Sequence, residues 1–300
     1  MPDVIATNAA LARKGIDKIL SIEAKRLPDY AGMMGFKDIS NSQRYIRIQQ
    51  EAGFGLFTQT TEFSAHPEVT LESPYSKDFY WNIYKMKYAI SEEAMAADQY
   101  GRQTAGKIGS KLALSLNQTK NSLSAQVIVG GFAGTTGPDG VVLFSASHPL
   151  ATGTSSNLGS ADISATELTT AIEAMMSQKD HKGQPFLCAG PYTLVVPVGN
   201  MVAAKVLKES LLLPGSPNND KNVQGMMVSD VIVNPYLTDA DSWFLVDKEM
   251  ADGLHRLVFS MGVKNRNKLN EDLNAVEFFS SFRESYGFHD WRGVWGSPGA

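Results

Sequence analysis

The sequence is poor in cysteine and in charge, and it has no long apolar run. Its single cysteine, Cys188, excludes an internal disulfide framework and a thiolate metal cluster. The apolar neighbours of Cys188 favour a small buried side chain rather than a nucleophile. No apolar stretch approaches the roughly 20 residues that span a bilayer, and the N-terminus lacks the pattern of a signal peptide. Synthesis in the cytosol and no membrane partner are therefore expected.

The charge is low and slightly negative, which bears on nucleic-acid binding. Charged residues make up 19% of the chain and the net charge is −4, whereas nucleic-acid binders usually carry a clearly basic face or domain. Any contact with DNA is therefore expected to be non-specific. The hydrophobic content of 43% is enough for a core. With 300 residues, either one large domain or two smaller ones are possible.

Local catalytic motifs are also lacking. Residues 101–108 have P-loop spacing, but Ile108 stands where a Ser or Thr must reach magnesium. The five histidines show no metal-ligand spacing. His148 lies near Ser145 and Ser147 without the glycine pattern of a nucleophile elbow, so a hydrogen-bonded structural histidine is favoured. No catalytic, metal or cofactor-binding residue is predicted, and no cofactor.

Two carboxylates, Asp239 and Asp241, could bind a cation or act as an acid–base pair. Aspartate also favours turns, and a turn between two strands explains the pair with fewer assumptions. Active sites are often assembled from distant residues, so a soluble α+β enzyme with a non-local site stays an alternative.

Residues 1–30 are interpreted as an arm. Residues 1–30 predict an amphipathic helix that Pro28 ends, with a narrow apolar stripe that includes Ile16 and Leu20. The glycines that follow indicate a flexible connection. We expect this helix to pack on a neighbour or on the body of the protein rather than in its core, and we expect residues 40–51 to be a polar link.

Residues 53–90 predict a long β-hairpin, with extended runs at 55–61 and 79–90 around a polar middle. An isolated two-stranded hairpin is only marginally stable in water. Its aromatic side chains therefore need another surface, which is either the core of the same chain or a second subunit. The candidate inter-subunit contact residues are Phe79, Trp81, Tyr84 and Tyr88.

The rest of the chain predicts an α+β arrangement without internal repeats. A long helix is expected from a cap at Ser91 to about 121, and a second helix follows a capping box formed by Ser164 and Glu167. A third helix opens at Asn200, with Val202, Ala203, Val206 and Leu207 expected to face inward. Strands are predicted at 192–198, 228–233, 243–246, 256–259, 276–283 and 288–295.

The order of these segments resembles the Mu-like major head subunit family, which has the Hong Kong 97-type capsid fold of tailed bacteriophages. The resemblance runs from about 45 to 295. It is carried by the order and spacing of seven segments: 88–93, 98–101, 139–150, 190–197, 234–239, 243–245 and 283–287. No single motif among them is specific to the family, and the resemblance depends on their order and spacing together.

This resemblance implies a virion capsid protein that assembles with itself into hexamers and pentamers of an icosahedral shell around double-stranded DNA. It also implies a division of the chain: N-terminal arm 1–50, extended loop 53–90, peripheral domain 91–184 with spine helix 91–123, axial domain 185–250, and a return to the peripheral sheet over 251–300. A portal or tail-tube protein is the alternative among phage parts. The short N-terminal segment suggests a processed form or a separate scaffolding protein, and a decoration protein is a further possible partner.

Some members of the family cross-link a lysine of the extended loop to an asparagine of a neighbour with the help of a glutamate. Lys77, Lys85 and Lys87 lie in the corresponding stretch, but the sequence assigns them no asparagine or glutamate. Solvated lysines on an exposed strand are therefore expected. We also expect no covalent cross-link between subunits.

Overall fold

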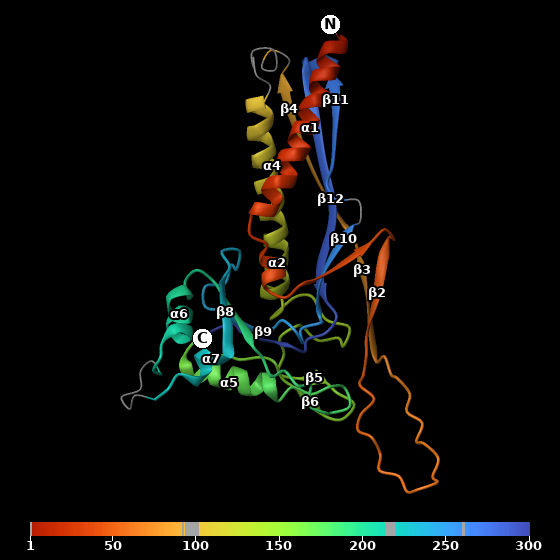
Figure 1. Ribbon diagram of the computed structural model, residues 1–300, viewed down its shortest axis with the longest axis vertical. Helices are drawn as coiled ribbons and strands as arrows, with labels where there is room; N and C mark the ends of the chain where they lie inside the picture. The colour runs from red at the N-terminus through yellow and green to blue at the C-terminus, as the bar shows by residue number, and fades with distance from the viewer. Residues whose placement is uncertain (1, 92, 94–101, 214–219, 260–261) are drawn as a thin grey trace.

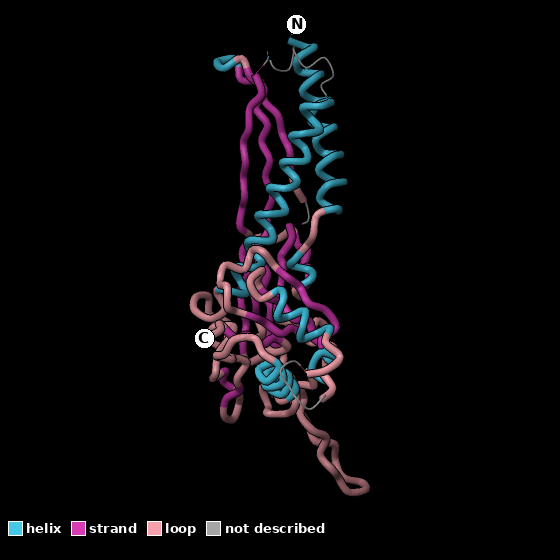
Figure 2. Tube along the Cα trace, turned by 90° about the vertical axis from the view of Figure 1, so that its left-hand side faces the viewer, coloured by secondary structure: helices cyan, strands magenta, loops and turns pink. Residues whose placement is uncertain are grey.

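The computed structural model describes residues 2–91, 93, 102–213, 220–259 and 262–300. Its upper half consists of two long helices laid against long strands (Figure 1). The lower half is a compact body of shorter helices and a second sheet, and an extended loop projects from it. A view turned by 90° shows how narrow the upper half is (Figure 2).

Two long helices form one layer of the upper half. Helix α1 is Pro2–Arg26 and helix α4 is Arg102–Val129. Ile16 and Leu20 of α1 are buried in one cluster with Leu112 of α4 and Phe278 of the sheet. The expectation that this helix stays out of the core was wrong, because its narrow stripe meets a second helix and a strand at once. Gly109 permits this close approach, since a Cβ there would lie 3.0 Å from a methyl group of Ile19.

The first sheet backs these helices, and its longest strand is β12, Ala275–Phe288. Strand β4 lies along one side of β12, and β11 and β10 follow one another along the other side. Strand β1 extends the sheet by parallel pairing with β10, whereas the other pairings are antiparallel. The bounds are β1 Lys37–Asn41, β4 Asn82–Ser91, β10 Leu254–Phe259 and β11 Lys264–Asn270, with the 3-10 turn η1 Glu271–Leu273 before β12.

The hairpin expected over 53–90 was wrong in its pairing. Strand β3, Tyr75–Tyr80, pairs with β2, Tyr45–Gln50, in a separate two-stranded sheet, whereas β4 pairs with β12. Residues 51–74, all of them described, contain no strand, so the run expected at 55–61 does not exist as one. Strand β4 pairs with the edge of the long strand β12, because an unpaired edge of that length would leave a row of backbone groups without partners.

The second sheet has the strand order β13-β9-β7-β8 and lies in the lower half. Every residue of β7 and β9 is buried, so both faces of these strands are covered. Leu194 and Leu245 face one hydrophobic cluster, while Val195 and Phe244 face another, as the alternation of strand side chains requires. The bounds are β7 Tyr192–Val196, β8 Val228–Val233, β9 Trp243–Asp247 and β13 Val294–Ser297.

Shorter helices cover the second sheet. Helix α5, Ala165–Met176, begins as expected, with the Ser164 hydroxyl accepting a hydrogen bond from the Glu167 amide at 3.2 Å. It packs in the same cluster as β7 and β9, so this helix belongs with the second sheet rather than with α4. The remaining short elements are α2 Tyr30–Met33, β5 His148–Pro149, β6 Thr154–Ser155, α6 Met201–Glu209 and α7 Val223–Met227.

Two further expectations change with the structure. The strand expected at 288–295 starts only at Val294, and it pairs with β9 of the second sheet instead of returning to the first. The long helix α4 continues to Val129, where Gly130 and Gly131 end it. The helix cap predicted at Ser91 falls largely outside the described residues, and Ser91 itself is the last residue of β4.

Candidate assembly surfaces

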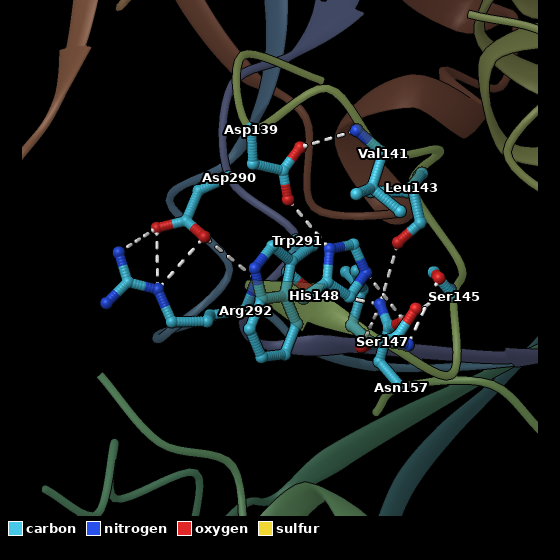
Figure 3. A network of polar contacts seen from close by, with 11 residues as sticks. Asp139, Val141, Leu143, Ser145, Ser147, His148, Asn157, Asp290, Trp291 and Arg292 are labelled. Atoms are coloured by element: carbon cyan, nitrogen blue, oxygen red, sulfur yellow. Dashed lines mark hydrogen bonds and ion pairs between the residues drawn. The ribbon is translucent and has the colours of Figure 1, made fainter. Parts of the chain in front are cut away.

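A buried histidine holds together the irregular segment 130–160. The imidazole of His148 lies 2.8 Å from a carboxylate oxygen of Asp139 and 3.1 Å from the side-chain oxygen of Asn157 (Figure 3). It is stacked on Trp291 with ring centroids 4.3 Å apart. Both ring nitrogens therefore lie within hydrogen-bond distance of side-chain oxygen atoms.

This cluster has the residue types of a catalytic triad but not its geometry. The Ser145 amide donates to Asn157 at 2.9 Å, and the Ser147 amide donates to the Ser145 hydroxyl at 3.2 Å. The second ring nitrogen of His148 is occupied by an amide oxygen instead of a serine hydroxyl, so there is no activated nucleophile. The expected structural role of His148 is confirmed.

A pair of buried histidines was missed in the sequence. Nε2 of His255 and Nδ1 of His289 lie 2.7 Å apart, and both rings are buried. Burial lowers the pKa of His255 to about 4, helped by its neighbour, and burial also lowers the pKa of His289. The two residues are 34 positions apart, on β10 and just beyond β12, so no local spacing could have revealed the pair.

Cys188 is buried as expected. Burial raises the pKa of its thiol to about 12, so the reactive thiolate form is disfavoured. Among the residues that the structure describes, no group of three or more His, Cys, Asp or Glu side chains could hold a metal ion.

The four aromatic residues proposed as inter-subunit contacts find partners inside the subunit. Phe79 is only 4% exposed and meets the ring of His255 edge-on. Tyr84 and Tyr88 stack on Phe282 and Phe278, with centroids 5.0 and 5.1 Å apart. Trp81 donates its indole N–H to the carbonyl of Gln43. The premise that these rings lack partners within one subunit was wrong; a role in contacts between subunits stays a prediction.

Two of the three lysines are not simply solvated, contrary to expectation. Lys77 donates to the carbonyl of Thr136 at 2.8 Å, and burial lowers the pKa of its ammonium group. Lys87 forms a 2.7 Å ion pair with the buried Glu277, which also accepts a 2.9 Å hydrogen bond from Asn270. The contacts of Lys87 and Asn270 with Glu277 connect β4, β12 and β11 within one subunit. The absence of a covalent cross-link between subunits stays a prediction.

Among the residues that the structure describes, the most exposed aromatic side chains lie in residues 51–74. From here on the name extended loop is kept for residues 51–74, in place of the predicted range 53–90. Phe57 and Phe63 are fully exposed, and Phe54, Leu56 and Leu71 are each more than half exposed. The segment projects below the body as an open loop (Figure 1). The sequence signal for these residues is the combination of aromatics with glycine and proline in a stretch without helix formers. This signal predicts an extended run at 55–61, which the structure shows as loop.

A second exposed apolar surface lies on and around α6 and α7, and it is named here the α6–α7 face. Val202 is 65% and Met226 is 80% exposed, and Val206 and Leu211 are also exposed. The expected inward set on α6 was therefore mostly wrong, since Ala204 and Leu207 are the buried positions. The two valines that continue the apolar pattern point to solvent in the single subunit.

A family model described as phage capsid protein matches residues 82–296 of this chain. That match spans more than half of the sequence. The chain belongs to the phage capsid protein family. It is a structural protein of a phage capsid rather than an enzyme. No curated protein is similar enough in sequence to count as a relative.

Solved capsids share the fold of this capsid protein. A virus-like particle from Pyrococcus furiosus is 11% identical with a TM-score of 0.55, covering 95% of this chain and 98% of that one. The capsid of Myoviridae phage XM1 is 11% identical with a TM-score of 0.54, covering 91% and 92%. The satellite phage P4 procapsid is 13% identical with a TM-score of 0.50, covering 94% and 89%.

These similarities confirm the predicted Hong Kong 97-type capsid fold. They fall at sequence identities that show fold alone. The finer assignment to Mu-like head proteins stays a prediction. In the described part of this capsid protein, no helix is long and apolar enough to cross a membrane.

Proposed function

We propose that this capsid protein assembles into hexamers and pentamers that close around double-stranded DNA, with the extended loop of each subunit lying on a neighbour. The extended loop carries this proposal. Fully burying one Phe side chain is favourable by about 1.5–3 kcal/mol, and the loop leaves Phe57 and Phe63 entirely in water. A second subunit can provide the missing cover.

The two halves of the subunit suggest a division of labour. The helices α1 and α4 with the first sheet form a peripheral unit, and α5 and α6 with the second sheet form an axial unit. We place the α6–α7 face at contacts around the symmetry axes, because it is the exposed apolar surface of the axial unit. Because this division follows the sheets, we assign α5 and β13 to the axial unit instead of the peripheral domain.

Partners other than the chain itself rest on analogy. The satellite phage P4 procapsid includes a size determination protein. By analogy, we propose a separate scaffolding or decoration protein as a partner of this chain. We also propose that the chain is synthesised in the host cytoplasm before it assembles into the virion.

The test is expression of the chain alone, followed by sedimentation and negative-stain microscopy. We expect closed shells or rings of subunits. The variant Phe57→Ser/Phe63→Ser should remain a folded subunit and assemble poorly, because the contact between subunits is lost. A matched control is Ser145→Ala, which changes an irregular segment that the body already anchors. Wild-type chain that stays monomeric at high concentration would overturn the proposal.

A further inference from the structure

The outer face of the first sheet carries a groove with room for a small ligand. The helices of the upper half lie on one side of the strands (Figure 2). The groove lies on the other side, on the face of β4, β12 and β11 that points away from α1 and α4, and its volume is about 840 Å³. Sites for small ligands commonly measure about 300–1,000 Å³, so one such molecule fits.

Positive charge is concentrated in this groove. The whole chain has a net charge of −4, yet none of the described residues that line the groove is acidic. Lys85 and Lys264 flank Ser281 from the two neighbouring strands, and like charges in one row of a sheet repel each other. An anionic ligand would relieve this repulsion. The cationic side chains that line the groove are Lys85, Lys87, Lys264, Arg266, Lys268 and Arg283.

An aromatic ring lies among these cations. Phe279 of β12 has Lys87 of β4 on one side and Arg266 of β11 on the other. Residues opposite one another on paired strands project from the same face, and the ammonium group of Lys87 lies 5.8 Å from the centre of the Phe279 ring. The ring is only partly buried. The groove therefore offers a flat apolar surface with positive charge on both sides.

A carboxylate on the same face is already paired. Glu277 lies two residues from Phe279 along β12, and its carboxylate forms a 2.7 Å ion pair with Lys87. It also accepts a 2.9 Å hydrogen bond from the side-chain amide of Asn270. Its charge is thus balanced within the sheet, so it does not neutralise the other cations of the groove.

The combination of charge and ring limits the class of ligand. A simple inorganic anion would use the cations and leave the Phe279 ring in water. A neutral aromatic molecule would cover the ring and leave the cations to repel each other. A nucleotide has both phosphate groups and a flat base. Cationic grooves with an aromatic side chain under each base are also what proteins use to bind single-stranded nucleic acid.

The number of rings favours a single nucleotide over a strand. Two phenylalanines are among the described residues that line the groove, Phe279 and Phe282. Phe282 packs against the cluster on the helix side of the sheet and stacks on Tyr84. One ring is therefore left for stacking in the groove, which provides for one base and not for a row of bases.

We propose that the groove on the outer face of β4, β12 and β11 binds a nucleoside triphosphate. Its base stacks on Phe279, and its phosphates lie against Lys85, Lys264 and the other cations. This site goes beyond the proposed self-assembly and does not depend on it. Binding weakens as salt is added, because the contacts join exposed charges that are screened within about 8–10 Å at 0.1–0.15 M ionic strength.

Calorimetric titration of the dilute, unassembled subunit tests the site. The full chain is titrated in magnesium-free buffer with ATP, with inorganic tripolyphosphate and with adenosine. ATP should bind at least about fivefold more tightly than tripolyphosphate, because a stacked base adds to the phosphate contacts. Adenosine should bind at least about tenfold more weakly than ATP, since it lacks the charge-assisted contacts. Equal affinities for ATP and tripolyphosphate would overturn the proposal.

Charge reversal places the ligand in the groove. The variant Lys264→Glu/Arg266→Glu should weaken ATP binding by at least about tenfold, because two cations are replaced by anions. The matched control Lys107→Glu/Lys111→Glu reverses two exposed charges on α4, on the helix side of the sheet, and should bind ATP like the wild type. A groove variant with wild-type affinity would overturn the site.

A third variant separates the ring from the charges. Phe279→Leu keeps an apolar side chain at this position and removes the flat ring. It should bind tripolyphosphate like the wild type, which also shows that the sheet is folded. Its affinity for ATP should fall to that for tripolyphosphate. A preference for ATP that survives this substitution would mean that the base does not stack on Phe279.

The remaining outcomes distinguish the source of the nucleotide and the two proposals. A short oligodeoxyadenylate that binds more than about tenfold more tightly than ATP would overturn the free nucleotide and assign the groove to single-stranded nucleic acid. If none of the probes binds, the site is overturned and self-assembly is untouched. Wild-type chain that forms no particles but binds ATP would overturn the proposed function and leave this site.

Discussion

Two long irregular segments of this capsid protein behave in opposite ways. Residues 130–160 and the extended loop 51–74 both contain glycine and proline, and neither forms more than short pieces of regular structure. The first segment buries Leu143 and Phe144 in the core. The second leaves its aromatic side chains in water. The local sequence of neither segment shows by itself whether it packs into the core.

The difference lies in how buried polar groups are satisfied. In residues 130–160, Asn157 donates to the carbonyl of Leu143 and accepts from Ser145, and His148 bridges Asn157 to Asp139. Such a network fixes an irregular backbone because each buried group depends on the others. The extended loop is joined to the body by β2 and β3 and by one backbone bond from Ala52 to Glu72 at its base. A segment of this second kind is suited to a partner outside the subunit.

The largest effect on stability is expected from removing the side-chain amide of Asn157, which anchors residues 130–160. Asn157→Ala should lower the free energy of unfolding of the unassembled subunit by about 3 kcal/mol, because several buried partners lose their hydrogen bonds at once. The measurement is urea denaturation. Ser156→Ala, one residue away and exposed, should change it by less than about 0.5 kcal/mol. Equal effects of the two substitutions would contradict the anchoring role of the network.

Acid should loosen the junction between the body and strand β3, which leads out of the extended loop. His255 touches Phe79 of β3, and the pair His255 and His289 is surrounded by Asp252, Lys37, Asp290 and Arg292. Burial lowers the pKa of His255 from 6.5 to about 4. The unfolded chain therefore binds a proton before the folded chain does, and stability is lost as the pH falls from 6.5 toward 4.

The expected loss from His255 is about 2 kcal/mol by pH 5, since each pKa unit corresponds to about 1.4 kcal/mol. His289 contributes in the same direction. Thermal melts of the unassembled subunit between pH 7 and 4.5 measure this loss. In His255→Gln the pH dependence over that range should become shallower, whereas His66→Gln, in the exposed loop, should keep the wild-type slope. A wild-type melt that does not change over this range would count against the pair.

The smallest effect on stability is expected from a change in the extended loop, in contrast to residues 130–160. Shortening the extended loop by replacing residues 55–69 with a short Gly-Ser linker should change the free energy of unfolding by less than about 1 kcal/mol, because loop-closure entropy varies slowly with length. Denaturation of the unassembled subunit gives this value. A large loss of stability would mean that the loop is part of the core after all.

The sequence by itself determined the α+β class, the two compact helices α5 and α6, most strands of the second sheet and the absence of local catalytic motifs. These features depend on short-range periodicity and caps such as Ser164, which a local pattern records. Its order of segments also pointed to the capsid fold. The four candidate contact residues predicted within 53–90 have partners inside the subunit, and a role of this region in contacts between subunits stays a prediction.

Only the tertiary structure decided which strand pairs with which. Strand β4 shows the same alternation whether its partner is a hairpin strand or β12, because a period of two records a covered face and not what covers it. The same holds for α1, whose narrow stripe fits an arm or a core helix, and for Val202 and Val206, whose burial depends on a neighbour. The pairing of His255 with His289 joins residues far apart in the chain, and only folding brings their side chains together.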